Sequence, residues 1–118
     1  MPVVHIGIIR DPLYRAHSNG SGHPERAERL EAIDDMLEGF DGREHLVDVP
    51  ARDATTEELG WVHAPQHIAE VEASRGGGFT MFTMDTFATA RSCEAAFRAA
   101  GGAMSGVEAV LDLSLIHI

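Results

Sequence analysis

The sequence predicts an α/β fold of which this chain holds the first part. Short apolar segments rich in β-branched residues predict strands, and segments with apolar residues every three or four positions predict helices. These segments follow one another in the order strand, helix, strand, helix, helix, which is typical of an α/β beginning. Two or three predicted strands do not complete a doubly wound sheet, so we expect the fold to be incomplete within these 118 residues.

The first predicted strand covers residues 3–9. This run is apolar and β-branched throughout, which is typical of a parallel strand buried on both faces. Residues 10–22 contain proline, asparagine and glycines and predict a long loop. A helix is expected to begin near Pro24 and to end at Gly39. Its predicted packing face consists of Ala27, Leu30, Ile33, Leu37 and Phe40.

Residues 45–49 predict a second strand, which Pro50 stops. Thr55 and Glu58 have the spacing of a capping box and predict a short helical turn. Pro65 can open the next helix, because a missing N–H costs nothing at the first helical position. Residues 76–78 are all glycine and break the chain before a short apolar segment at residues 79–84.

The longest predicted helix runs from about Thr89 to Val110. Within it, Gly101 and Gly102 each cost about 1 kcal/mol in helix propensity, so we expect them to allow tight backbone packing or a kink. The spacing of the apolar side chains predicts a packing face made of Ala96, Ala100, Ala103, Val107 and Leu111.

The net charge of −10 and the complete absence of lysine exclude a basic patch, so we expect no nucleic acid partner. No apolar run approaches the length of about 18 residues that spans a membrane, and we expect no membrane partner. An acidic surface can attract cationic substrates or can serve solubility alone. Residues 1–10 lack the basic start and long apolar stretch of a secretion signal, so we expect a cytoplasmic location. The single cysteine, Cys93, fits a reducing compartment, and we expect its thiol to be packed and inert. The oligomeric state is not defined by the sequence.

Two histidines, His17 and His23, flank a glycine-rich loop. They could bind a metal ion, but zinc takes three or four ligands and the spacing supplies two. The loop could also hold an anion at the helix start, although Glu25 and Glu28 would repel it. A structural role, with His23 hydrogen-bonded near the helix start, is the favoured interpretation.

A second histidine pair, His63 and His67, has helical spacing, but Pro65 predicts that the helix begins between the two. We therefore interpret this spacing as chance. Residues 75–78 lack the lysine and hydroxyl residue of a phosphate-binding loop and predict a flexible connection. Asp85 precedes the longest helix and is interpreted either as its cap or as a loop carboxylate that accepts hydrogen bonds from a substrate, and the local pattern alone favours the cap.

Four blocks of the sequence occur in a recognisable order. They are Asp11-Pro12 with His17; residues 22–33, beginning Gly22-His23-Pro24-Glu25-Arg26; residues 61–68, with Trp61-Val62-His63; and Asp85-Thr86-Phe87, followed by residues 92–96 and 99–102. Together they resemble the N-terminal portion of the histone deacetylase superfamily, in particular its bacterial class II-like, acetoin-utilisation and acetylpolyamine amidohydrolase members. Three positions depart from the family pattern: Ala27 stands for a frequent proline, His67 for a frequent tyrosine, and residues 88–91 lack a frequent Pro-Gly.

The resemblance implies that residues 1–112 are the N-terminal portion of an arginase-like three-layer α/β domain with a parallel sheet. It implies a zinc-dependent hydrolase that removes acyl groups from lysine side chains or polyamines. The family's catalytic histidine pair and zinc ligands have no counterpart here, so we expect no catalytic residue, no bound zinc and no activity in the chain alone. Asp85 resembles the rim carboxylate that binds the substrate backbone, and Arg29 resembles the arginine beside an internal channel. An ordinary helical ion pair between Glu25 and Arg29 is the alternative for Arg29.

Residues 113–118 do not match the family. A transposon-end adapter used in DNA library preparation encodes the same hexapeptide, so we expect a non-native tail; the alternative is a native short strand. Two other classes of function stay open at this point. One is a small non-catalytic α/β interaction module that is native at this length. The other is an independent metal-binding protein that uses His17, His23, His63 and His67.

Overall fold

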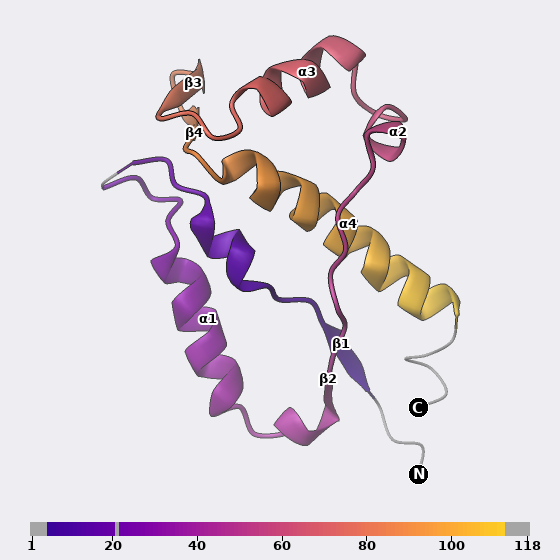
Figure 1. Cartoon of the computed structure of the whole chain (residues 1–118). Helices are drawn as coiled ribbons and strands as arrows, with labels where there is room; N and C mark the ends of the chain where they lie inside the picture. Colours follow the sequence, from indigo (N-terminus) through magenta and orange to yellow (C-terminus); the bar gives the residue numbers. More distant parts are fainter. Residues whose placement is uncertain (1–4, 21, 113–118) are drawn as a thin grey trace.

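A computed structural model describes residues 5–20 and 22–112 (Figure 1). Predictions for residues 1–4, for Ser21 and for the expected non-native tail at 113–118 lie outside the described residues. The elements are β1 (Ile6–Ile8), the 3₁₀ helix η1 (Pro12–Ala16), α1 (Glu28–Glu38), the 3₁₀ helix η2 (Arg43–His45), β2 (Leu46–Asp48), α2 (Thr56–Leu59), α3 (Pro65–Ala73), β3 (Thr80–Thr83), β4 (Thr86–Ala88) and α4 (Ser92–Leu111). Their order confirms the α/β prediction. No helix in the described part of the chain is both long and apolar enough to span a membrane.

The two predicted strands form a parallel pair. Ile6 lies opposite Leu46 and Ile8 opposite Asp48, and α1 lies in the connection between β1 and β2. The prediction that the first strand is buried on both faces is wrong: Ile6 is half exposed. Within the described residues this sheet has only two strands, so neither strand is an interior one.

The long loop before α1 has more structure than the sequence predicts, because η1 forms within it. Asp11 caps η1 by accepting a hydrogen bond from the Leu13 amide at 2.9 Å. The prediction that the next helix begins near Pro24 is wrong, since α1 begins at Glu28. Local bonds explain the delay: the Glu25 amide donates to Nδ1 of His23 at 3.0 Å, which holds this segment in a bend. Gly39 caps the end of α1, as predicted.

Helix α4 lies across the middle of the molecule and packs against η1 (Figure 1). The segment between β2 and α2 crosses it closely, and the Ala54 amide donates to the Phe97 carbonyl at 2.9 Å. A Cβ atom at Gly101 would overlap the Arg52 carbonyl oxygen, and one at Gly102 would overlap the Tyr14 hydroxyl. The glycine pair therefore permits tight backbone packing, as predicted, and α4 runs unbroken through it.

The predicted packing face of α4 is wrong. The buried residues of the helix are small ones: Ser92, Cys93, Ala95, Gly101, Gly102 and Ser105. Val107, Val110 and Leu111 are exposed, Leu111 to 73%. Larger side chains do not fit on the buried side of α4, because η1 and the crossing segment approach the helix backbone itself.

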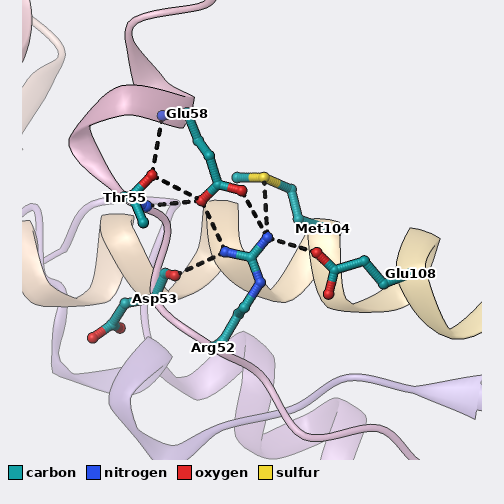
Figure 2. Close-up of polar contacts among 6 residues, drawn as sticks. All are labelled: Arg52, Asp53, Thr55, Glu58, Met104 and Glu108. Atoms are coloured by element: carbon teal, nitrogen blue, oxygen red, sulfur yellow. Dashed lines mark hydrogen bonds and ion pairs between the residues drawn. The ribbon is translucent and has the colours of Figure 1, made fainter.

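Charged side chains fasten the crossing segment to α4 (Figure 2). Both terminal nitrogens of Arg52 donate to the Glu58 carboxylate at 2.8 Å, and Nη2 also donates to Oε1 of Glu108 at 2.7 Å. Glu58 completes the predicted capping box with Thr55. The Arg52 guanidinium, followed by the Thr55 amide, lowers the pKa of Glu58 to about 2. Arg98 of α4 pairs in the same way with Asp11 at 2.8 Å and with Asp53 at 2.7 Å.

Candidate functional site

Asp85 lies in the turn of an antiparallel hairpin formed by β3 and β4. Its side chain is 91% exposed, and its amide donates to Oγ1 of Thr83 at 3.2 Å. The interpretation of Asp85 as the cap of the longest helix is wrong, because β4 intervenes and α4 begins only at Ser92. The other interpretation, a loop carboxylate that accepts hydrogen bonds from a substrate, stays a prediction.

His23 holds Asp85 from the opposite side of the loop. Its Nε2 lies 3.0 Å from Oδ1 of Asp85, and its Nδ1 accepts the Glu25 amide at 3.0 Å. The second bond confirms the prediction that His23 is hydrogen-bonded near the helix start. It also defines the neutral tautomer, because a nitrogen that accepts an N–H carries no proton of its own. In the neutral ring the proton is therefore on Nε2, which donates to Asp85.

Two aromatic rings support this pair. The His23 and Phe87 rings are nearly perpendicular, with a centroid distance of 6.3 Å and an interplanar angle of 86°. Phe87 in turn stacks on Phe79 at 4.9 Å. Edge-to-face and offset-stacked arrangements are the favoured geometries for aromatic pairs. The His23 ring is consequently held by hydrogen bonds at both nitrogens and packs against Phe87.

A second, buried layer of polar bonds joins the same loop to the hairpin and to α4. Asn19 is buried; its Oδ1 accepts the Phe87 amide at 3.1 Å, and its Nδ2 donates to Oε2 of Glu25 at 2.6 Å. The same Nδ2 lies 3.3 Å from Nε2 of His17, so that nitrogen accepts and Nδ1 of His17 donates to Oγ of Ser92 at 2.8 Å. Asn19 and Ser92 were missed by sequence reasoning, since their partners are distant along the chain.

An apolar cavity of about 490 Å³ lies beneath the hairpin. Its lining includes Tyr14, His17, Val71, Phe87, Ala88 and Cys93. Cys93 is buried, as predicted, and burial raises the pKa of its thiol above the ordinary value. A raised pKa favours the neutral thiol over the nucleophilic thiolate.

Arg29 lies exposed on α1 and does not line this cavity. The alternative ion pair with Glu25 does not form, because the Glu25 carboxylate accepts from Asn19 instead. Its role beside an internal channel stays a prediction.

The remaining histidines lie apart from the hairpin. His63 and His67 are exposed with ring centroids 5.1 Å apart, and α3 begins between them at Pro65, as predicted. Among residues 5–20 and 22–112, no three His, Cys, Asp or Glu side chains come together as a possible metal site. The residues described here therefore do not make a zinc site by themselves, and no chemical step through zinc is derived from them.

Residues 23–117 match the histone deacetylase domain family, and the chain belongs to this family. It is 39% identical over 82 residues to "Histone deacetylase 15" of Arabidopsis thaliana, across 67% of this chain and 14% of that protein. It is 33% identical over 110 residues to "Probable deacetylase" of Archaeoglobus fulgidus, across 90% of this chain and 30% of that protein.

The crystal structure of the HDA15 HD domain has the same arrangement of elements. The two structures superpose with a TM-score of 0.79 at 30% sequence identity, over 92% of this chain and 32% of that chain. This match confirms the predicted family and fold class. The chain spans between about a seventh and a third of the length of these relatives.

Proposed function

We propose that the protein to which this chain belongs is a zinc-dependent deacylase that hydrolyses acyl-lysine or acyl-polyamine amides, and that Asp85 binds substrate at the rim of its active site. Family membership supports the deacylase reaction, because the chain matches the histone deacetylase domain over residues 23–117. The position of Asp85 supports the rim role.

The exposed hairpin turn is the observation that carries the rim assignment. A carboxylate accepts hydrogen bonds only, so it suits the N–H groups of a substrate backbone or of a polyamine. One oxygen of Asp85 is bonded to His23, and Oδ2 has no hydrogen-bond partner among residues 5–20 and 22–112. The hairpin thus presents one fixed and one available carboxylate oxygen.

The charge of the chain favours a cationic substrate. The net charge is −10, and an acidic protein raises the local concentration of cations near its surface. Lysine-rich peptides and polyamines both carry positive charge beside the acylated nitrogen. This long-range attraction is weakened by salt, so we expect substrate affinity to fall as ionic strength rises.

The zinc ion that we propose for the whole protein would be held by parts of the domain outside this chain. When bound, such an ion polarises the amide carbonyl and activates water. The contribution of the present residues is to bind and orient substrate at the hairpin. We therefore expect the 118-residue chain alone to hydrolyse no acyl substrate.

The reaction is tested with the longer protein that contains this chain. Hydrolysis of an acetyl-lysine peptide and of an acetylpolyamine is measured before and after removal of metal with a chelator, and after zinc is returned. We expect activity on at least one substrate, its loss on chelation and its recovery with Zn²⁺. Absence of hydrolysis of both substrates, or activity that survives metal removal, contradicts the proposal.

A further inference from the structure

The His23–Asp85 pair joins two segments that are 62 residues apart in the sequence. His23 is mostly buried, with 17% of its side chain exposed, whereas Asp85 is 91% exposed. An exposed aspartate on a hairpin turn ordinarily samples several rotamers, because few contacts restrain it. Here the imidazole ring of His23 restrains Asp85, and the ring is itself held by its hydrogen bond with the Glu25 amide.

The direction of each hydrogen bond decides which part of His23 acts on Asp85. Nδ1 accepts the Glu25 amide and anchors the ring to the loop, and Nε2–H donates to Oδ1. Phe87 packs nearly perpendicular to the ring at a centroid distance of 6.3 Å. The ring therefore holds Oδ1, while Oδ2 has no hydrogen-bond partner in the described part of the chain.

We propose that His23 is the positioning residue for the rim carboxylate, and that it acts by donating its Nε2–H to Asp85. This inference rests on the proposed function of Asp85 in substrate binding. This role of His23 is separate from its hydrogen bond with the Glu25 amide. The two roles use different ring nitrogens, so substitutions that keep one nitrogen's function can separate them.

The test compares His23→Gln with His23→Asn in the longer protein. A Gln amide can place its nitrogen near the position of Nε2 and donate to Asp85, whereas the shorter Asn can replace only Nδ1 and accept the Glu25 amide. We expect His23→Asn to raise KM about tenfold with little change in kcat, since it removes a hydrogen bond to a charged group that orients substrate. We expect His23→Gln to restore most of the lost binding.

Two controls sharpen the comparison. His45→Asn changes an exposed histidine on η2 whose Nε2 lies 3.5 Å from Oε1 of Glu44, and it should leave KM unchanged. In the double variant, His23→Asn combined with Asp85→Ala should bind no more weakly than Asp85→Ala alone, because both changes remove one shared contribution. An unimpaired His23→Asn, or a His23→Gln as impaired as His23→Asn, overturns the positioning role.

The bond itself is tested in the longer protein by ¹⁵N NMR of the histidine rings. We expect His23 to show a protonated Nε2 and an unprotonated Nδ1, and Asp85→Ala to shift Nε2 while Asp41→Ala does not. The opposite tautomer, or a signal insensitive to Asp85→Ala, contradicts the inference.

A wild-type protein without deacylase activity would overturn the proposed function, whereas an active wild-type protein with an unimpaired His23→Asn variant overturns the positioning role alone.

Discussion

At the scale of single residues, Glu58 makes two sets of hydrogen bonds with one carboxylate. It closes the capping box of α2 with Thr55, and it binds both terminal nitrogens of Arg52. Arg52 is at the same time bonded to Glu108 of α4. The crossing segment, the short helix and the long helix therefore share one group of hydrogen bonds (Figure 2).

The lowered pKa of Glu58 predicts how stability changes with acidity. The folded pKa is about 2 against an ordinary value of 4.5, so the folded state binds fewer protons between these values than the unfolded state. The contribution is fully present above about pH 4.5 and is lost as pH falls towards 2. Urea unfolding of the chain across this pH range should show that the free energy of unfolding falls less with decreasing pH for Glu58→Gln than for wild type. Glu57→Gln, at the neighbouring exposed position, should follow wild type; a Glu58→Gln profile parallel to wild type contradicts the assignment.

Residue patterns in the sequence predict local bonds better than distant ones. The capping box of Thr55 with Glu58 and the bond of His23 near the helix start are both short-range and both confirmed. The bond from His23 to Asp85 spans 62 residues and leaves no local signal. Asn19 was assigned only to a loop, yet it is buried and bonded to the Phe87 amide.

At the scale of elements, the packing of α4 depends on two glycines, which carry no side chain. Gly101 and Gly102 allow the segment at residues 51–54 and η1 to contact the helix backbone. A helix interior normally disfavours glycine by about 1 kcal/mol relative to alanine. The close crossing offsets that cost, because any larger residue would push the crossing segment away.

Gly101→Ala tests this packing. We expect it to lower the free energy of unfolding by about 1–3 kcal/mol, since a Cβ would overlap the backbone of Arg52 and overpacking outweighs the gain in helix propensity. Gly106→Ala is the matched control in the same helix. Its Cβ would lie 2.7 Å from Cδ1 of Ile9, the movable end of a side chain, so its effect should be near neutral. Equal effects of the two substitutions in urea unfolding would show that the crossing is not tight.

The positions of strands and helices were predicted more reliably than the faces that they bury. The strands at β1 and β2 and the helices α2, α3 and α4 lie where the sequence predicts them. The hairpin turn was not foreseen, because Met84 and Asp85 are not the glycine-containing pair that marks tight turns. The packing face of α4 was wrong because hydrophobic periodicity points the larger apolar residues inward, whereas this helix buries its glycines and serines.

At the scale of the whole molecule, the described chain is elongated, with extents of 51 × 34 × 20 Å. The hairpin with Asp85 lies at one end and the β1–β2 pair at the other (Figure 1). Several large apolar residues are exposed, among them Trp61, Val62, Val107 and Leu111. The chain corresponds to 32% of the solved deacetylase-family chain.

The family could be predicted from the sequence because it depends on the order of four blocks rather than on one residue. The burial of the side chains on β1 could not be predicted in the same way. A β-branched strand such as β1 predicts a covered sheet, but coverage depends on strands and helices that pack on it, and the described residues supply a sheet of two strands.

The proposed function depends most on Asp85 as the substrate-binding carboxylate of a deacylase. The most direct test is steady-state kinetics of Asp85→Ala in the longer protein, with Asp41→Ala as the control at an exposed loop position. We predict that Asp85→Ala raises KM about tenfold while kcat changes little, because a hydrogen-bonding contact to the substrate outside the reacting bond is lost. A KM for Asp85→Ala equal to that of wild type and of Asp41→Ala would contradict this role of Asp85.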